Sequence, residues 1–238
     1  MNLPLNAPGL PLPTQSPRFI NLYQDAVSTS PDQVARQTTQ ALELDAITRG
    51  LLAQPANVSP KYFYDELGSK LFEAITLLEE YYPTRTEAGI LDAAMVEIRD
   101  ELAAHGIRNP CLIDLGAGNC AKAAKLIPSL EPRQYVPVDI SVDFLRDAAG
   151  QLQNSFPALD IVGVGMDFSA GLVLPPEIQT QNRLFFYPGS SLGNFHPDDA
   201  LNFLKHIADP QEGNAKALLL GIDLVKDSET LEAAYDDA

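Results

Sequence analysis

Several apolar runs in this sequence end in polar residues of types that bind small ligands. The stretch "FFYPGSSLGNF", residues 185–195, continues an apolar run and then presents Ser190, Ser191 and Asn194. Other apolar runs end in the same way, at residues 114–119, at Asp139, at Asp167 with Phe168, and at Asp223. The carboxyl ends of parallel strands share one edge of a sheet, and ligands bind there. We therefore expect these side chains to line a single site.

The segment "DLGAGNC" has the glycines of a ligand-binding turn. Gly116 and Gly118 let the backbone turn sharply and let a ligand approach without a Cβ in the way; an ordinary strand-to-helix turn is the alternative. Asp139 follows roughly twenty residues later, where a carboxylate can accept both hydroxyls of a ribose. Capping of a helix near Ser141 is the alternative role for Asp139. The two features together favour a nucleoside ligand.

The strand end at Asp167 and Phe168 indicates which nucleoside binds. A dinucleotide is not expected, because Ala121 takes the place of the third glycine of G-x-G-x-x-G. Asp167 can accept a hydrogen bond from an adenine amino group, and Phe168 can stack on the ring, with core packing as the alternative for Phe168. Adenosine without a pyrophosphate points to S-adenosylmethionine as the cofactor.

The elements that position these residues alternate between strand and helix from about residue 109 onward. Apolar runs that predict strands are separated by helical patterns; the strand segments are "CLIDLGAG", "YVPVDIS", "LDIVGVGMDF", "RLFFYPGSS" and "AKALLLGIDLV". Such alternation is typical of an α/β fold, in which helices cover both faces of a parallel sheet.

The residues before this point are predicted to form three helices and no strand. The first helix begins near Ser30 and Pro31, which suit a helix cap and a first turn. Two further helices are expected around residues 71–78 and from about 84 to 105. The chain is thus expected to divide into a proline-rich, extended lead-in (1–28), a helical region (29–108) and a sheet-containing region (109–238).

The composition excludes several classes of function. The 238 residues carry a formal net charge of −16 and no cluster of Lys and Arg, which argues against binding to nucleic acid or to an anionic membrane surface. No signal peptide or membrane span is visible. Cys111 and Cys120 are too few for a disulfide framework, so a cytoplasmic location is expected.

The remaining polar residues favour neither a metal site nor a hydrolase. His105, His196 and His206 lie apart and lack the spacing of metal ligands, so helix-end or surface roles are expected for them. Asp236 and Asp237 are expected to be solvated. No arrangement of Ser, His and Asp suggests a hydrolase.

Six ordered motifs resemble those of the histidine-specific methyltransferase family of ergothioneine biosynthesis. The resemblance runs from about Ser59 to the last residue, and its more specific parts are "EYYPTR", "GSSLGNF", "LVKD" and "AYDDA". It implies a Rossmann-like class I methyltransferase sheet with an additional substrate-binding domain. Part of that domain is the N-terminal helical region.

The resemblance also implies the residues of the site. The family's cofactor contacts fall on Gly116, Lys122, Asp139, Asp167 and Phe168, and its amino-acid contacts fall on Tyr81, Asn194 and Tyr235, with Tyr64 as a further candidate. An asparagine amide can donate to a carboxylate and accept from an amine, as recognition of an amino acid requires.

The implied chemistry is transfer of methyl groups from S-adenosylmethionine to the α-amine of L-histidine, which yields the trimethylated betaine hercynine. A model α-amino group has a pKa of about 8, so its lone pair becomes available near neutral pH without a strong base. Proximity and alignment then provide most of the rate. We accordingly expect no catalytic acid or base and no metal.

The sequence departs from the family at its C-terminal end. Family members continue past "AYDDA" with the last two strands of the sheet and with a segment that contacts the imidazole, so these strands are expected to be missing and "ALLLGIDL" to form an exposed edge. A second chain is one expected source of the segment. Two alternatives remain open: a methyltransferase of another small amine, such as a thiohistidine or an aminophosphonate, and a cofactor-binding partner without activity of its own.

Overall fold

The computed structural model describes residues 15–22, 33–169 and 171–235 and contains a parallel sheet of six strands. The strand order is β1-β4-β3-β2-β5-β6, and every neighbouring pair is parallel. The elements in chain order are β1 (Arg18–Asn21), α2 (Gln33–Leu52), η1 (Pro60–Phe63), α3 (Glu66–Ile75), α4 (Tyr82–Ala104), β2 (Cys111–Leu115), α5 (Ala121–Leu130), β3 (Gln134–Asp139), α6 (Val142–Ser155), β4 (Asp160–Gly165), β5 (Arg183–Tyr187), η2 (Ser191–Asn194), α7 (Pro197–Ala208), β6 (Ala217–Leu220) and α8 (Ser228–Tyr235). The expected α/β fold is confirmed.

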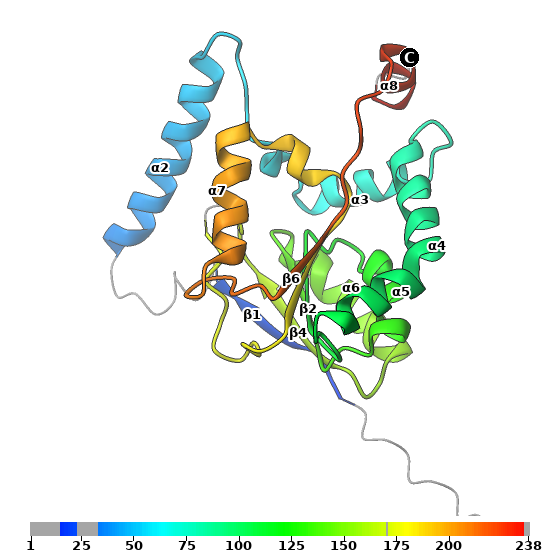
Figure 1. Cartoon of the computed structure of the whole chain (residues 1–238). Coiled ribbons are helices and arrows are strands. Elements are labelled where there is room, and N and C mark those ends of the chain that lie inside the picture. The colour runs from blue at the N-terminus through cyan, green and yellow to red at the C-terminus, as the bar shows by residue number, and fades with distance from the viewer. Residues whose placement is uncertain (1–14, 23–32, 170, 236–238) are drawn as a thin grey trace, which may run out of the picture.

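Helices cover both faces of this sheet (Figure 1). One apolar core joins the sheet to α4, α5 and α6, and the second joins it to α7 and to residues 172–178. The central strands β2 and β5 are buried along their whole length. Such burial explains why they read as continuous apolar runs, since each face of a central parallel strand is covered.

The strands expected from residue 109 onward are all present, but the prediction that no strand precedes them is wrong. Strand β1 pairs with β4, with Arg18 opposite Val162 and Phe19 opposite Gly163. A Cβ on Gly163 would lie 2.6 Å from the Phe19 ring, so the glycine makes room for this strand. Part of the expected lead-in (1–28) therefore belongs to the sheet; residues 1–14 and 23–28 lie outside the described residues.

The expected helices of residues 29–108 are present with shifted ends. The second begins earlier than expected because Asp65 caps it, accepting a hydrogen bond from Gly68 N–H at 2.7 Å. The third begins at Tyr82, so Pro83 lies in its first turn, where a missing N–H costs nothing. The proposed cap at Ser30 and Pro31 lies outside the described residues.

The order of the strands reverses between β2 and β5. The chain passes from β2 to β3 and β4 in one direction, and then places β5 and β6 on the other side of β2. A ligand crevice forms outside the carboxyl ends of the strands at such a reversal. Strand β6 ends the sheet, which confirms the expected apolar edge. Among the helices of the described residues, none is both long and apolar enough to cross a membrane.

Candidate functional site

The turn after β2 has the backbone conformation that the glycine motif predicts. Gly116 has φ +68° and Gly118 has φ +52°, values that favour glycine. The Gly116 N–H donates to Val138 O at 2.9 Å, so the turn is tied to β3. A Cβ on Gly116 would lie 4.0 Å from the ring of Phe168. The turn and the aromatic ring thus face each other at the strand ends.

Asp139, at the end of β3, is bound by backbone groups from two elements. Its Oδ2 accepts from Gly118 N–H and its Oδ1 accepts from Ser141 N–H, both at 2.9 Å. Burial raises the pKa of Asp139, while these N–H groups act in the opposite direction. The bond to Ser141 resembles the capping alternative, but α6 begins at Val142, and Asp139 also holds the glycine turn. Each oxygen keeps a second lone pair for a ligand hydroxyl.

Asp167 and Phe168 follow β4 at the same edge of the sheet. Lys61 Nζ, from η1, donates to Asp167 Oδ2 at 2.9 Å. Burial raises the pKa of Asp167, but hydrogen bonds from Ser169 and Lys61 outweigh it and hold the pKa below the ordinary value. The Phe168 ring packs at 5.7 Å from that of Phe203 on α7. Core packing of Phe168 is therefore real, and one side of the ring still faces Gly116.

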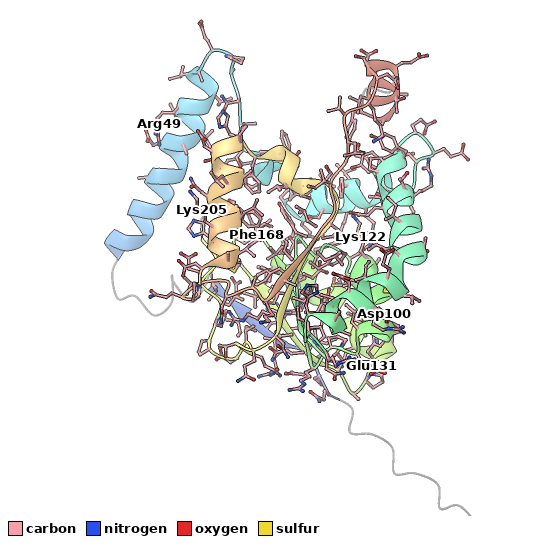
Figure 2. All side chains as sticks on the ribbon, in the orientation of Figure 1. Arg49, Asp100, Lys122, Glu131, Phe168 and Lys205 are labelled. Atoms are coloured by element: carbon pink, nitrogen blue, oxygen red, sulfur yellow. The ribbon has the colours of Figure 1, made fainter. Side chains whose placement is uncertain are left out.

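Lys122, in the first turn of α5, is paired with a carboxylate from α4. Its Nζ lies 2.5 Å from Glu87 Oε2, and Glu87 Oε1 accepts from Gly189 N–H at 2.7 Å. Gly189 follows β5, so one carboxylate joins α4, α5 and the strand ends. Figure 2 shows Lys122 on the side of α4 and α5 and Phe168 on the side of α7. The two candidate cofactor residues thus lie toward opposite faces of the sheet, Lys122 with the core of α4 and α5 and Phe168 with the core of α7.

Four aromatic rings form a continuous cluster beside the rim. Tyr64 contacts Phe72 at 5.8 Å, Phe72 contacts Tyr81 at 6.0 Å, and Tyr81 contacts Tyr235 at 5.6 Å between ring centroids. Burial, followed by the charge of Asp139, raises the pKa of Tyr64, and burial followed by the neighbouring Tyr235 raises the pKa of Tyr81. Both phenols are therefore neutral hydrogen-bonding groups at neutral pH.

Asn194 ends η2 and is exposed. Helix α7 begins at Pro197 as expected, but its N-cap residue is His196, so Asn194 does not cap it. Ser190 Oγ accepts from Asp223 N–H at 2.9 Å, which ties this turn to the segment after β6. The contacts that join Tyr64, Tyr81 and Tyr235 are between aromatic rings, so they do not tie Asn194 to this cluster.

A second polar cluster, around Asp223, holds the segment after β6 to the start of α4. The Tyr82 hydroxyl donates to Asp223 Oδ2, and Lys226 pairs with Asp223 Oδ1. These hydrogen bonds hold the pKa of Asp223 below its ordinary value. Tyr82 is the neighbour of Tyr81, so the cluster fixes the helix end from which Tyr81 projects.

Asp114 lies buried in β2 beneath the rim. Its Oδ2 accepts from the Tyr135 hydroxyl at 2.8 Å, while Oδ1 is buried without a hydrogen-bond partner among the described residues. Burial raises the pKa of Asp114 to about 7, against an ordinary 3.8. The folded protein therefore binds a proton at Asp114 that the unfolded chain releases between these pH values, and this contribution lowers stability as pH rises through the window.

We expect Asp114→Asn, which mimics the protonated acid, to remove this dependence. The unfolding free energy of the wild type should fall relative to the variant by on the order of 2 kcal/mol between pH 5 and pH 8. Urea denaturation at several pH values measures the difference. Parallel curves for the two proteins would show that Asp114 is ionised throughout the range.

The structure brings most of the predicted residues to one edge of the sheet. Gly116, Asp139, Asp167 and Phe168 lie at the ends of three adjacent strands, and Lys122 lies in the first turn of the helix after the glycine turn. Three further residues, which the sequence motifs do not predict, reach this edge from the helical region. They are Lys61, Glu87 and Tyr82, which contact Asp167, Lys122 and Asp223, respectively. The only available signal is that Tyr82 and Glu87 lie in or beside "EYYPTR".

Metal binding and thiol chemistry find no support in this part of the chain. Within residues 15–22, 33–169 and 171–235, no group of three His, Cys, Asp or Glu side chains could hold a metal ion. Cys111 and Cys120 are free and buried, and burial raises the pKa of each thiol to about 12. His206 pairs with Glu212 and His105 with Glu101, in keeping with the expected surface roles. Asp236 and Asp237 lie outside the described residues.

Comparison with known proteins places these residues in a family. The family model described as a histidine-specific, SAM-dependent methyltransferase matches residues 43–238. The chain is 40% identical over 209 residues to a histidine N-alpha-methyltransferase of Mycolicibacterium smegmatis, covering 86% of this chain and 62% of that protein. It is 38% identical over 192 residues to the protein of that name from Mycobacterium tuberculosis, with coverage of 79% and 57%.

A fungal relative is more distant. Ergothioneine biosynthesis protein 1 of Neurospora crassa is 31% identical over 189 residues, a match that covers 77% of this chain and 21% of the relative. The chain thus spans less than two thirds of the length of each of these three curated relatives.

Proposed function

The chain belongs to the family of histidine-specific, SAM-dependent methyltransferases, and on that premise we propose that it methylates the α-amine of L-histidine with S-adenosylmethionine. The product of three transfers is hercynine, the betaine of the ergothioneine pathway. The observation that carries the proposal is the contact between Tyr81 and Tyr235, which joins two family motifs beside the Rossmann-like strand ends.

The strand ends suit the adenosine part of the cofactor. The left-handed turn at Gly116 lies beside the Phe168 ring, and in this proposal the adenine stacks on that ring. Asp139 retains lone pairs for the ribose hydroxyls. Pairing with Lys61 keeps Asp167 ionised, and an ionised carboxylate accepts a hydrogen bond from the adenine amino group. When bound, the sulfonium supplies an electrophilic methyl group.

The tyrosines and Asn194 bind and orient the amino acid. Because the pKa values of Tyr64 and Tyr81 are raised, both phenols stay protonated and can donate to the substrate carboxylate without repelling it. The Asn194 amide can serve the carboxylate and the amine together. The amine loses its proton to solvent near its ordinary pKa, so the residues of this site position the reactants and none acts as a dedicated base.

Substrate binding and cofactor binding are assigned to different regions of the chain in this proposal. Residues 29–108 contribute Tyr64 and Tyr81 to a substrate domain, and residues 109–238 hold the cofactor. The small molecule bound is an amino acid, and nucleic acid is not a partner. We propose that further polypeptide pairs with the edge strand β6 and reads the imidazole, because Ile222, Leu224 and Val225 beside that edge are exposed.

Methyl transfer to histidine tests this function. Incubation with S-adenosylmethionine and L-histidine should yield mono-, di- and trimethylated histidine by mass spectrometry, and size-exclusion chromatography of the active species reports whether a second chain is present. Methylation of a thiohistidine or an aminophosphonate in place of histidine would support the alternative substrate. Binding of S-adenosylhomocysteine without transfer to any amine would support a cofactor-binding partner.

A further inference from the structure

Glu87 is a carboxylate that reaches the rim from the helical region. Its side chain is 17% exposed, and it contacts Lys122 and the Gly189 N–H. Taking a carboxylate out of water costs free energy that one lysine and one amide offset only in part. Glu87 is therefore a costly group to place at this point, unless it has a ligand to bind.

Attachment of α4 to α5 does not require Glu87. Asp92 and Lys125 already join the same two helices, with Lys125 Nζ 2.8 Å from each carboxylate oxygen. That pair is far more exposed, since the Asp92 side chain retains 59% of its accessible surface. Exposed pairs of this kind are the usual way to link two surface helices at little cost. The two pairs provide a matched comparison within one interface.

Two glycines leave room around the Glu87–Lys122 pair. A Cβ on Gly189 would lie 3.1 Å from Lys122 Nζ, and a Cβ on Gly221 would lie 2.0 Å from Glu87 Oε1. Gly189 also has φ +81°, which favours glycine. The ends of β5 and β6 are thus shaped so that an anion and a cation sit side by side at the edge where ligands bind.

We propose that Glu87 and Lys122 together bind the zwitterionic amino-acid head of the cofactor, with Lys122 holding the α-carboxylate and Glu87 holding the α-ammonium. This inference rests on the proposed function and on the family resemblance, which implies that Lys122 contacts the cofactor. A neighbouring carboxylate and ammonium complement an amino acid, in which the same two charges are also neighbours. Glu87 is thereby a cofactor-binding residue contributed by the helix that follows Tyr81.

Three adenosine ligands separate the two charges. S-adenosylhomocysteine carries both, S-adenosyl-3-thiopropylamine carries only the ammonium, and methylthioadenosine carries neither. Isothermal titration calorimetry should show that Glu87→Gln weakens the first two ligands about tenfold or more and leaves methylthioadenosine within about twofold. Lys122→Met should weaken S-adenosylhomocysteine alone. Asp92→Asn, the control at the exposed pair, should change none of the three.

Each other outcome contradicts a stated part of the account. Equal losses for all three ligands in Glu87→Gln would show that Glu87 only maintains the shape of the rim, and unchanged or tighter S-adenosylhomocysteine binding would show that it does not hold the ammonium. If thermal unfolding shows that Glu87→Gln does not fold, Glu87→Asp takes its place. This variant keeps the charge on a shorter side chain and should show smaller losses of affinity, with the three ligands in the same order. A wild type that binds none of the three ligands contradicts the proposed cofactor site itself, and the inference with it.

Discussion

Replacing Asp139 by alanine is expected to weaken the binding of S-adenosylhomocysteine by about 5- to 150-fold, the equivalent of about 1 to 3 kcal/mol. The variant lacks the carboxylate that binds the ribose. The Gly118 and Ser141 N–H groups, which donate to this carboxylate in the wild type, also lose their acceptor. The turn in front of Phe168 is then less well fixed. Calorimetry measures the change in affinity.

Asp147→Ala is the matched control for this variant. Asp147 lies on α6, immediately after β3, and is exposed, so its loss should leave the affinity unchanged. Thermal unfolding of both variants separates a lost contact from a lost fold. Wild-type affinity in a folded Asp139→Ala protein would remove the ribose assignment.

Replacing Asn194 by alanine is expected to raise the KM for histidine by about 5- to 150-fold while the affinity for S-adenosylhomocysteine stays near that of the wild type. The amide contacts the carboxylate and amine of the substrate in this account, not the cofactor. Stability should change by less than about 0.5 kcal/mol, because the side chain is exposed and the N-cap position of α7 is His196 and not Asn194. Steady-state kinetics and thermal unfolding on the same sample provide both values.

Asn202→Ala, an exposed change on α7, controls for the substitution itself. A fall in stability of Asn194→Ala with unaltered histidine kinetics would show that Asn194 supports the turn after β5 and does not touch the substrate. A parallel loss of cofactor affinity would move the residue to the cofactor site.

The strands of the central sheet could be predicted because their burial leaves a strong pattern. Strands β2 and β5 are covered on both faces, so most of their residues are apolar, and Gly116 and Pro188, which follow them, mark the strand ends. Strand β1 has four residues at the sheet edge and pairs with β4, more than 140 positions away, with Arg18 opposite Val162. Nothing local distinguishes so short an edge strand from an extended loop.

The part of the candidate site that lies at the strand ends could also be predicted from the sequence. Residues that follow parallel strands share one edge, so Asp139 and Asp167 could be grouped from topology alone. Glu87 and Lys61 reach that edge from helical segments, and sequence periodicity indicates which face of a helix is apolar but not which strand end the polar face meets. Their partners become visible only when the helices are placed on the sheet.

Titration of L-histidine into protein saturated with S-adenosylhomocysteine tests the central claim most directly, since it asks whether the strand ends and the tyrosine cluster form adjoining sites for cofactor and amino acid. We predict one histidine bound per cofactor, with histamine, which lacks the carboxylate, bound at least about tenfold more weakly. Binding of S-adenosylhomocysteine without any binding of histidine would contradict the account.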